Sequence, residues 1–475
     1  MTNIKLDNNQ LDNNDIEFFT QLLGAKYVLT DKAKIEPHIE EPRKIYKGKS
    51  PCVLRPANTE QVSKIMAHAN KRSLAIIPQG GNTGLVGAQV PKLGGEIILS
   101  LSRLSADIKV SKQTQSLTCG VGNTLAQVQL AALDAGLFFP LSLASEGSCQ
   151  IGGNISSNAG GTGVLKYGNM RDLVLGLEVV MADGQIWNGL KNLRKDNTGY
   201  DLKHLFIGSE GTLGIVTQAC LKLYAKPQHT AIAFCGIQTP QDAVNLLSLA
   251  QQNSDNQVTA FEIIPQIGID FVMKHGQDMR FPLESQAPWY ILLELASQDE
   301  VMMNILEKAY EAELISDAVV AQNETQAKDF WRIRHVLSEV QSLEGGSIKH
   351  DISVAVADIP EFLSKAAEIV KSVMPDARLV PFGHIGDGNL HYNVSQPVDM
   401  DKQKFLDHWY DVADKVHDLV LSMNGSVSAE HGIGQMKFND MRKIKSDIEL
   451  TMMRQIKTQF DPKNILNPMK TIPLD

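Results

Sequence analysis

The sequence predicts an α+β protein, and three features of the chain indicate this fold class. Short apolar segments alternate with segments of helical periodicity at residues 52–99 and again from 227 to about 424. Two further segments, residues 79–91 and 146–163, are rich in glycine and continue no helical pattern. The segment 383–391 places Asp-Gly between alternating apolar runs, which is typical of a β-hairpin with a two-residue turn. We therefore expect an antiparallel sheet covered by helices on one face in the second half of the chain.

The composition is that of an ordinary globular protein, with 475 residues of which 43% are hydrophobic and 21% are charged. This length predicts two or three domains. The net charge of −9 argues against non-specific nucleic-acid binding and against a polybasic membrane anchor. The five cysteines are far apart and form no C-x-x-C pair, which argues against a disulfide framework, a zinc knuckle or an iron–sulfur cluster. Because no apolar run has the length of a signal peptide or a membrane span, we expect a cytoplasmic protein.

The first element predicted is a helix over residues 14–23. Asn14 or Asp15 can cap its N-terminus, and Gly24 follows its last apolar residue. Residues 25–50 are charged and irregular, and we interpret them as a surface connection.

A strand–helix–strand pattern follows at residues 52–99. Residues 52–56 are a predicted strand, a helix begins at Thr59, and residues 74–78 are a buried strand. The second strand runs directly into the glycine-rich segment 79–91, whose backbone could approach a pyrophosphate closely. The glycine spacing is neither G-x-G-x-x-G nor a Walker motif, so an ordinary turn remains the alternative for this segment alone.

The other glycine-rich segment follows a predicted helix at residues 124–136. Residues 146–163 contain Gly, Ser and Asn without periodicity, and so long a loop in a compact domain is uncommon unless it is functional. Two such segments separated by one helix could wrap a dinucleotide from two sides. Residues 173–187 predict a strand, an Asp-Gly turn and a second strand, and residues 208–216 predict a third glycine-bearing turn that enters a strand.

The pattern changes after Lys226-Pro227. A strand is followed by a helix with Thr239 as its cap and Pro240 at its first helical position. Short strands then alternate with helices, at residues 258–264, 289–296, 347–354, 378–385 and 389–394.

The hairpin also predicts a metal site. Counting outward from the Asp-Gly turn pairs His384 with His391 on one face, with Cβ atoms about 4.5–5.5 Å apart. Two imidazoles at that distance could bind one metal ion, and Asn393 points to the same face. Glu430, in the segment SAEHGIG, is the best candidate for a third ligand, which leaves the open position that catalytic zinc sites keep. The alternative is two ordinary sheet histidines.

Several motifs, in this order, resemble one known family over residues 45 to 475. They are PQGGNTGLVG, GGNISSNAGG, RKDNTGYDLKHLFIGSEGTLGIVT, GHIGDGNLHYN and SAEHGIG. Together they resemble the FAD-dependent D-2-hydroxyacid dehydrogenases, flavoproteins with the vanillyl-alcohol-oxidase type of FAD domain. The resemblance implies a two-part FAD-binding domain and an α+β cap domain with an antiparallel sheet. The implied boundaries are a helical lead-in at 1–46, the FAD-binding domain at 47–226, the cap or substrate domain at 227–424, and a C-terminal segment at 425–475 that returns to the FAD-binding domain.

The resemblance implies that FAD lies along the glycine-rich segments. Some relatives attach FAD covalently through a His in the first segment, where this chain has Asn82, so we expect FAD to be bound non-covalently. The residues implied to bind FAD are Pro78, Gln79, Gly80, Gly81, Asn82, Thr83, Gly84, Leu85, Gly147, Ser148, Gly152, Gly153, Asn154, Ser157, Asn158, Gly160, Gly161, Glu210, Gly211, Ile215 and Asn467.

The family pattern places the helix predicted at residues 326–340 over the substrate. Arg334 and Ser338 are four residues apart and share a face, although an arginine at such a position is most often simply solvated. With Lys349 they would hold a carboxylate. Relatives that act on D-2-hydroxyglutarate carry Thr at the Ser338 position. Asn393 and His431 complete the implied substrate site, and His431 is the implied general base.

The implied activity is oxidation of D-2-hydroxyglutarate to 2-oxoglutarate, with a divalent metal, expected to be zinc, assisting deprotonation and with hydride transfer to FAD. D-lactate and D-malate are alternative substrates. A non-catalytic flavin- or metal-binding protein is an alternative function, as is the related NADPH-dependent reductase of peptidoglycan synthesis, against which the paired histidines argue. Without a dinucleotide fingerprint for NAD, we expect an electron-transfer flavoprotein or a quinone as acceptor. We also expect a homodimer, with no nucleic-acid partner and no membrane span.

Overall fold

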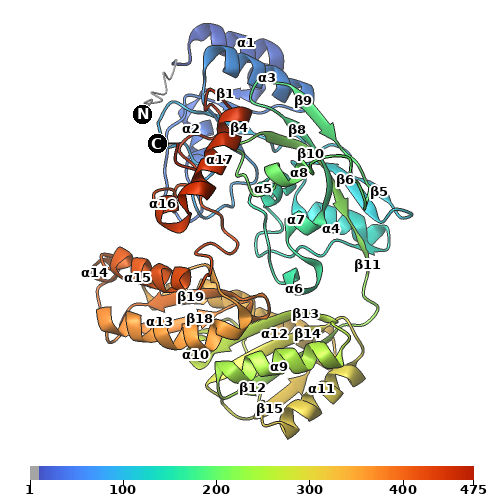
Figure 1. The fold of residues 1–475 in the computed structure, drawn as a ribbon, viewed down its shortest axis with the longest axis vertical. Helices are drawn as coiled ribbons and strands as arrows, with labels where there is room; N and C mark the ends of the chain where they lie inside the picture. The colour runs from blue at the N-terminus through green and yellow to red at the C-terminus, as the bar shows by residue number, and fades with distance from the viewer. Residues whose placement is uncertain (1–9, 475) are drawn as a thin grey trace. The chain divides into compact units, whose positions relative to one another are not determined.

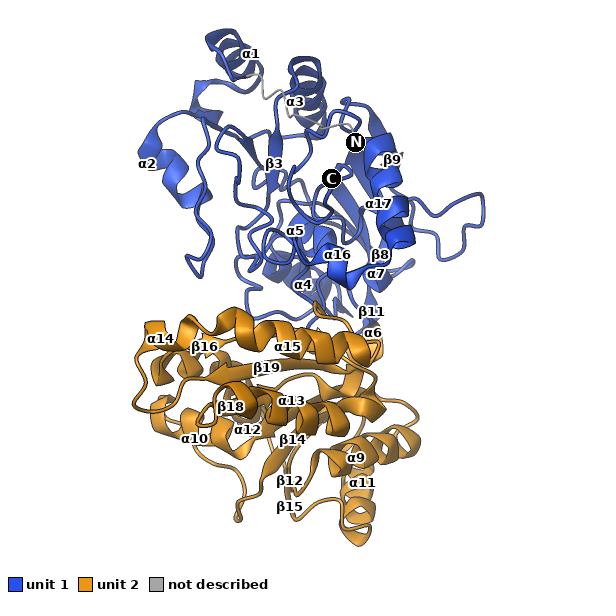
Figure 2. Cartoon of the chain, turned by 60° about the vertical axis from the view of Figure 1, so that its left-hand side comes forward, with its two compact units in different colours: residues 1–161, 168–226, 430–475 blue, residues 162–167, 227–429 orange. Residues whose placement is uncertain are grey.

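The structure is a computed structural model that describes residues 10–474, which fold into two compact units. Unit 1 comprises residues 1–161, 168–226 and 430–475, and unit 2 comprises residues 162–167 and 227–429 (Figure 2). The chain therefore passes from one unit to the other more than once, and each unit is built from segments that are distant in the sequence.

Unit 1 begins with α1 (Asn13–Leu23), which buries Phe19 and Leu23. The expected cap at Asn14 or Asp15 is wrong, because Asp12 caps the helix. The Asp12 carboxylate accepts the Asp15 N–H and the Asp15 carboxylate accepts the Asp12 N–H, both at 3.0 Å, which is a capping box. Gly24, with φ +87°, ends the helix as expected.

The first sheet of unit 1 has the strand order β1-β2-β4-β3. It contains β1 (Val28–Leu29), β2 (Val53–Leu54), β4 (Ile97–Ser100) and β3 (Ile76–Gln79), with parallel pairing of β4 to β2 and β3. Helix α3 (Thr59–Arg72) connects β2 to β3, as predicted. The expectation of an irregular 25–50 segment is only partly correct, because it contains β1 and the short helices η1 (Ala25–Tyr27), α2 (Lys32–Ile35) and η2 (Glu36–His38).

The second sheet of unit 1 is antiparallel, with the strand order β5-β6-β10-β8-β9. Its strands are β5 (Lys109–Ser111), β6 (Ser116–Gly120), β8 (Val174–Val180), β9 (Ile186–Gly189) and β10 (Ile215–Lys222). Around it lie α4 (Leu125–Asp134), α7 (Met170–Leu173), α8 (Lys203–Phe206), the pair β7 (Leu137–Phe138) and β11 (Tyr224–Ala225), and the C-terminal helices α16 (Met441–Ile444) and α17 (Asp447–Phe460) (Figure 1).

The second glycine-rich segment was predicted to be an unstructured loop. This prediction is wrong for part of it, because residues Ile151–Ser156 form the helix α5. The three apolar or amide side chains of this short helix, Ile151, Asn154 and Ile155, are buried. Their burial stabilises a helical turn that the two intervening glycines disfavour.

Unit 2 contains an antiparallel sheet in the order β13-β14-β12-β15. Its strands are β12 (Ala231–Ile237), β13 (Val258–Pro265), β14 (Trp289–Leu295) and β15 (Asp317–Val320). The helices α10 (Gln266–His275) and α12 (Glu324–Val340) share one hydrophobic core with Phe234 and Tyr290, while α9 (Pro240–Asn253) and α11 (Asp299–Glu311) also contact β12. Because all seven residues of β12 are buried, both faces of this sheet are covered, and the expectation of helices on one face is wrong for it.

A second sheet of unit 2 is centred on β19 (Asn389–Ser395), which pairs with β16 (Ser347–Ile348), β17 (Ile352–Ser353) and β18 (Arg378–Phe382). Helices α13 (Ile359–Val373), α14 (Lys402–Leu406) and α15 (Trp409–Ser422) belong to the same part of the chain, with the turns η3 (Gln341–Glu344) and η4 (Val356–Asp358). The short helix α6 (Val164–Tyr167) contacts β13, and Lys166 Nζ donates to Gln257 Oε1 at 2.5 Å, which ties residues 162–167 to unit 2.

The predicted hairpin register is wrong. Phe382, not His384, lies opposite His391, and residues 385–387 form the 3-10 turn η5 (Ile385–Asp387) between the strands. The cause is Gly383, whose N–H and C=O pair with Ile263 of β13 at 3.1 and 2.9 Å. Its φ of +138° takes the chain out of β18 early, so the loop is longer than two residues.

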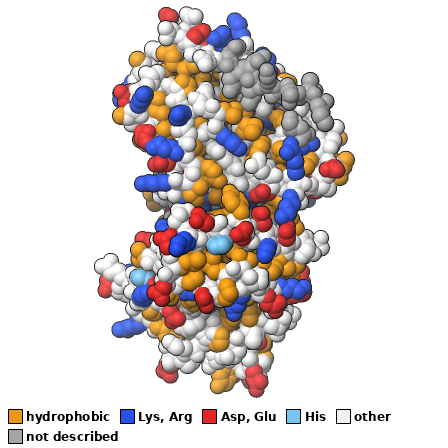
Figure 3. All heavy atoms as spheres, turned by 90° about the vertical axis from the view of Figure 1, so that its left-hand side faces the viewer, with side chains coloured by type: hydrophobic (Ala, Val, Ile, Leu, Met, Phe, Trp, Pro, Cys, Tyr) orange, Lys and Arg blue, Asp and Glu red, His pale blue; other side chains and the backbone are white. Residues whose placement is uncertain are grey.

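Charged side chains of both signs are interspersed on the face drawn in Figure 3, with no broad basic area on that face of the described residues. Within residues 10–474, no helix has the combination of length and apolar character that crossing a membrane requires.

Candidate active site and metal centre

The first glycine-rich segment of unit 1 leaves β3 at Pro78 and Gln79. The buried Gln79 amide donates to the His38 and Gln89 carbonyl oxygens at 2.8 and 3.2 Å, so its side chain holds the segment in place. Asn82 has φ +57°, and its amide donates to the Pro37 and Glu40 carbonyl oxygens at 3.2 and 2.9 Å. The backbone of this segment, more than its side chains, is therefore available to a ligand.

The two glycine-rich segments are in contact. A Cβ atom on Gly81 would lie 2.1 Å from the Ser148 carbonyl oxygen, so only glycine allows this approach. In contrast, a Cβ on Gly147 or Gly153 would meet no described atom within 4 Å, apart from each glycine's chain neighbours and, for Gly153, the nearby backbone of its own helix. The sequence thus keeps glycine at two positions where the protein itself does not require it, as a cradle for a bound ligand would.

Other residues predicted to bind FAD make local bonds that shape the second segment. Ser157 Oγ donates to the Gly153 carbonyl oxygen at 3.0 Å, and Asn158 Oδ1 accepts the Arg171 N–H at 2.9 Å. Asn154 is buried inside α5. These side chains position the backbone, and direct contact with FAD stays a prediction for them.

Glu210 connects three parts of unit 1. Its buried carboxylate accepts the N–H groups of Ile433 and Gly434 at 3.0 to 3.1 Å and the Thr471 hydroxyl, and its carbonyl oxygen accepts the Asn467 amide at 2.7 Å. Burial raises the pKa of Glu210, although these donors act in the opposite direction. The Glu210 carboxylate is therefore used inside the protein, where it holds the SAEHGIG segment and the C-terminal segment together.

The residues of unit 1 that are predicted to bind FAD have two features that fit a bound dinucleotide. Four predicted residues that are not glycine have left-handed backbone, with φ of +44° to +57°, namely Asn82, Asn158, Glu210 and Asn467. Strain of this kind is concentrated at ligand sites. The buried side-chain oxygens of Asn82, Gln150 and Asn467 have no hydrogen-bond partner among the described residues, and they could accept from hydroxyl or N–H groups of the cofactor.

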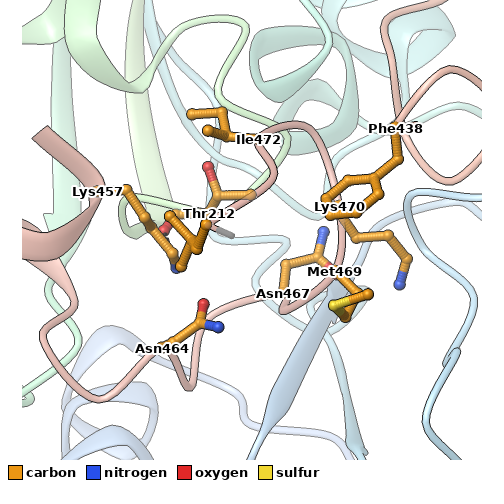
Figure 4. A pocket seen from close by; sticks show the side chains of 9 residues that line it. Thr212, Phe438, Lys457, Asn464, Asn467, Met469, Lys470 and Ile472 are labelled. Atoms are coloured by element: carbon orange, nitrogen blue, oxygen red, sulfur yellow. Dashed lines mark hydrogen bonds between the residues drawn. The ribbon is translucent and has the colours of Figure 1, made fainter. Parts of the chain in front are cut away.

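A small cavity of about 30 Å³ lies beside Asn467 (Figure 4). Lys457 and Lys470 reach it from different sides. Lys457 Nζ donates to Asp461 at 2.5 Å and to the Thr212 and Leu466 carbonyl oxygens at 2.8 Å, whereas Lys470 Nζ donates to the Val90 carbonyl oxygen at 2.8 Å. The cavity is too small for a hydroxyacid and suits a single water molecule.

The two histidines predicted as metal ligands come together in unit 2 despite the different register. Their ring centroids are 5.6 Å apart at an interplanar angle of 74°, and their nitrogens lie within 4.8 Å. His384 Nδ1 bonds Glu262 Oε1 at 2.5 Å, which leaves Nε2 as the ring nitrogen directed to a metal. The donor set therefore fits a divalent metal of the zinc type.

Glu262, which the sequence analysis did not single out, contacts both a predicted metal ligand, His384, and a predicted substrate-binding residue, Arg334. It lies in β13, where all other side chains are apolar or Thr, and it is 1% exposed. Burial would raise its pKa, but His384 and Arg334 outweigh burial and lower the pKa to about 2. A single carboxylate inside the apolar run VTAFEIIP was the available signal, because an ionised buried Glu requires partners.

Arg334, predicted to hold a substrate carboxylate, already has an ion pair within the protein. Its side chain is buried, Nε donates to Glu262 Oε2 at 2.6 Å, and the guanidinium lies 4.8 Å from the centre of the Phe382 ring. Ser338, one turn later on α12, is exposed, and so is Lys349 between β16 and β17. The positive charge of Arg334 is thus already balanced by the carboxylate of Glu262.

Asn393 is buried on β19 two residues beyond His391, so it shares the face of that histidine as expected. Its amide donates to Gln341 Oε1 at 2.8 Å, while its Oδ1 has no partner among the described residues. Gln341 in turn donates to Ser395 Oγ at 2.9 Å. Asn393 therefore presents an oriented polar group beside the histidine pair.

Glu430 and His431 lie at the start of the last segment of unit 1 and are half-buried. Glu430 Oε1 accepts the Gly161 N–H of the second glycine-rich segment at 2.9 Å. Next to them, Gly432 has φ +82°, and a Cβ there would lie 2.2 Å from Glu210 Oε1. The predicted third ligand and the predicted base therefore sit on a segment that Glu210 and the second glycine-rich segment hold.

Comparison with known proteins gives matches over most of the chain. Residues 50–189 match the model of an FAD binding domain, and residues 226–471 match that of the C-terminal domain of FAD linked oxidases. The chain is 38% identical to the mitochondrial D-2-hydroxyglutarate dehydrogenase of Arabidopsis thaliana over 468 residues, 98% of this chain and 82% of that protein. It is 36% identical to the D-2-hydroxyglutarate dehydrogenase of Stutzerimonas stutzeri, over 96% of this chain and 98% of that protein. Among solved structures, p-cresol methylhydroxylase superposes with a TM-score of 0.76 and 17% identity, over 97% of both chains.

Proposed function

The chain belongs to the FAD-linked oxidase family and has the vanillyl-alcohol-oxidase type of fold, and on this premise we propose that it oxidises D-2-hydroxyglutarate to 2-oxoglutarate. The relatives from Arabidopsis thaliana and Stutzerimonas stutzeri, which carry the name of that activity, support the substrate. FAD is the electron acceptor within the protein. We propose that it is bound non-covalently, because an amide side chain, Asn82, stands where linked relatives have His.

The observation that carries this proposal is the histidine pair of unit 2. His384 has its Nδ1 fixed by a buried carboxylate, and His391 lies at a ring distance of 5.6 Å with a nearly perpendicular orientation. Metal-binding histidines almost always donate their other ring N–H to a carboxylate, a backbone carbonyl or water, and the Glu262 carboxylate supplies such a partner to His384. The pair is therefore better explained as two ligands of a divalent metal, for which zinc is our proposal.

We propose Glu430 as the third ligand, and chain connectivity supports it. The Ala429 N–H donates to the Asp351 carbonyl oxygen at 3.2 Å, and the neighbouring Ile352 lies opposite Leu390, beside His391. Consecutive Cα atoms are about 3.8 Å apart, so Glu430 starts within reach of the histidines. Two imidazoles and one carboxylate leave a coordination position for substrate.

The remaining residues bind and deprotonate the substrate in this proposal. When bound, the metal lowers the pKa of the substrate hydroxyl, and FAD accepts the α-hydrogen as hydride. His431 takes the hydroxyl proton as general base. Asn393 orients the substrate next to His391.

The distal carboxylate of D-2-hydroxyglutarate gives a binding role to Arg334, Ser338 and Lys349. In this proposal Lys349, the terminal nitrogens of Arg334 and the Ser338 hydroxyl donate hydrogen bonds to the distal carboxylate, while Arg334 Nε stays bonded to Glu262. D-lactate has only a methyl group in the place of the distal carboxylate, so it can accept none of these hydrogen bonds. D-2-hydroxyglutarate is therefore preferred over D-lactate, with D-malate between them.

We propose an electron-transfer flavoprotein or a quinone as the final electron acceptor. We also propose that the protein lies in the cytoplasm and forms a homodimer. The name of the Arabidopsis thaliana relative places that protein in mitochondria.

Anaerobic mixing of the purified holoenzyme with single hydroxyacids tests the proposed function. D-2-hydroxyglutarate should bleach the flavin absorbance, and its L-enantiomer and D-lactate should act far more slowly or not at all. Bleaching by D-lactate at an equal or higher rate would contradict the assignment of a dicarboxylate. A flavin that no hydroxyacid bleaches would favour a non-catalytic flavoprotein.

A further inference from the structure

The inference concerns Glu262 and rests on the metal site of the proposed function. Three elements of unit 2 converge on this side chain. Its strand β13 is bridged to Gly383, the residue before His384, and helix α12 brings Arg334 to the other side. One buried carboxylate thus contacts a predicted metal ligand and a predicted substrate cation at the same time.

Both partners of Glu262 donate a hydrogen bond to its carboxylate. Arg334 Nε always carries a hydrogen, and it lies 2.6 Å from Oε2. His384 Nδ1 lies 2.5 Å from Oε1 and must also carry a hydrogen if Nε2 is to bind a metal. Only a carboxylate offers an acceptor oxygen to each side, because a carboxamide has one oxygen and one NH₂ group.

We propose that Glu262 is a positioning residue that couples the two halves of the substrate site, by fixing the metal-binding tautomer of His384 and the direction of the Arg334 guanidinium together. The Phe382 ring, 4.8 Å from the guanidinium carbon, supports the same plane for Arg334 from another side. Glu262 touches neither substrate nor cofactor in this role, and acts through the two residues that do.

The substitution Glu262→Gln separates this role from simple packing, because it keeps the size of the side chain. Its NH₂ group must face either Arg334 Nε or His384 Nδ1. In the first case Arg334 loses its acceptor. In the second case the His384 ring must accept at Nδ1 and carry its hydrogen on Nε2, which cannot then bind a metal. Either arrangement damages one half of the site.

The test measures zinc affinity by competition with a coloured chelator, and KM for D-2-hydroxyglutarate and D-lactate, in wild type and Glu262→Gln. If the NH₂ group faces His384, we expect zinc affinity to fall by about 10–100-fold, the range seen when outer partners of metal ligands are removed. If it faces Arg334, we expect KM to rise more for the dicarboxylate than for D-lactate. The matched control is Glu294→Gln on the adjacent strand β14, where the half-buried carboxylate accepts from Thr259 and Trp331 at 2.7 and 2.9 Å. This control should bind zinc like wild type.

If Glu262→Gln does not fold, Glu262→Asp replaces it. The shorter carboxylate keeps both acceptor oxygens but cannot reach both partners, so either zinc affinity or the preference for the dicarboxylate should still fall. Wild-type zinc affinity together with a wild-type ratio of the two KM values in the folded Glu262 variant, or an equal loss in the Glu294 control, would overturn the inference while leaving the proposed function intact. Wild-type protein that binds no zinc at all would instead refute the metal site itself.

Discussion

At the residue scale, two buried lysines of unit 1 differ in how their charge is balanced. Lys457 has an ion pair with Asp461 and two carbonyl acceptors, whereas Lys470, which is 2% exposed, donates to the Val90 carbonyl oxygen and has no ion pair among the described residues. Burial lowers the pKa of Lys470 to about 8, although Glu96 and Glu210 act in the opposite direction. The charged form of Lys470 therefore destabilises the fold.

This imbalance predicts a pH-dependent effect of Lys470→Met, which keeps the length of the side chain. The unfolded chain holds the lysine proton up to the ordinary pKa of 10.5, and the folded chain releases it near pH 8. The penalty is thus complete below about pH 8 and disappears as pH rises to about 10.5. In FAD-free protein, denaturant unfolding should show the variant to be more stable than wild type at pH 7, by a margin that shrinks between pH 8 and 10.5.

The Val90 carbonyl oxygen keeps a second donor, Gln435 Nε2 at 2.8 Å, so the substitution leaves no unsatisfied acceptor. Lys457→Met is the comparison variant, since it also breaks an ion pair and should destabilise the protein at every pH tested. A Lys470 margin that does not change with pH would contradict the assigned charge state.

Residue types were easier to predict than residue partners. The histidine pair follows from the local Asp-Gly signal, yet the true register depends on the bridge from Gly383 to Ile263, which is distant in sequence. Arg334 was predicted to bind the substrate from the family resemblance, since its place on a helix alone indicated only a solvated side chain. Its partner Glu262 lies 72 residues away, and no local pattern links the two.

At the element scale, the glycine-rich segments have two kinds of glycine. Gly81 is required by the protein, because a Cβ would collide with the Ser148 carbonyl oxygen. Gly153 is different, since its Cβ position is open, and glycine inside a helix costs about 0.5–1 kcal/mol relative to alanine. The protein keeps this cost in α5, which points to a ligand that needs the space.

This difference predicts opposite effects of Gly153→Ala on the free and bound protein. Without FAD, the variant should be more stable by about 0.5–1 kcal/mol in denaturant unfolding. With FAD, its dissociation constant should rise by about tenfold, equivalent to about 1.4 kcal/mol, because the methyl group occupies space next to the cofactor. Fluorescence titration of the FAD-free protein measures the second quantity.

Gly95→Ala serves as the control, because Gly95 also has open space around its Cβ and lies outside both predicted FAD-binding runs. It should leave FAD affinity unchanged. An unchanged affinity in Gly153→Ala as well would show that α5 does not contact the cofactor.

The elements themselves were well predicted wherever apolar periodicity was strong, as for α3, α4, α9 and α12. The helix α5 was missed because two glycines hide its pattern, and its stability comes from burial of Ile151 and Ile155 in the rest of unit 1. Helices on both faces of the β12–β15 sheet were missed because the sequence does not show on which side a helix returns.

At the scale of the whole molecule, the motif resemblance gave the correct family and fold class, which the family matches and the structural likeness confirm. Composition alone could not give them, since it is ordinary. The predicted FAD-binding residues lie in unit 1, while both histidines proposed as metal ligands lie in unit 2. Cofactor retention and metal binding should therefore be separable.

Metal removal tests this separation. Dialysis of the holoenzyme against a strong chelator should abolish oxidation of D-2-hydroxyglutarate, while the flavin spectrum and the FAD content stay as before. Added zinc should restore activity in wild type but not in His391→Ala. Release of FAD together with the metal would contradict the separation, and full activity in protein shown to be metal-free would exclude a catalytic metal.

The way the chain is shared between the units has a practical consequence for producing unit 2 alone. Expression of residues 227–429 as one continuous fragment would omit α6. Leu165 of α6 packs closely on Gly386, since a Cβ on Gly386 would lie 2.9 Å from the Leu165 side chain. Such a fragment would expose part of β13 to solvent and would be prone to aggregate. A soluble unit 2 calls for residues 162–167 to be fused back through a short glycine linker, so that the missing hexapeptide is supplied in the same polypeptide.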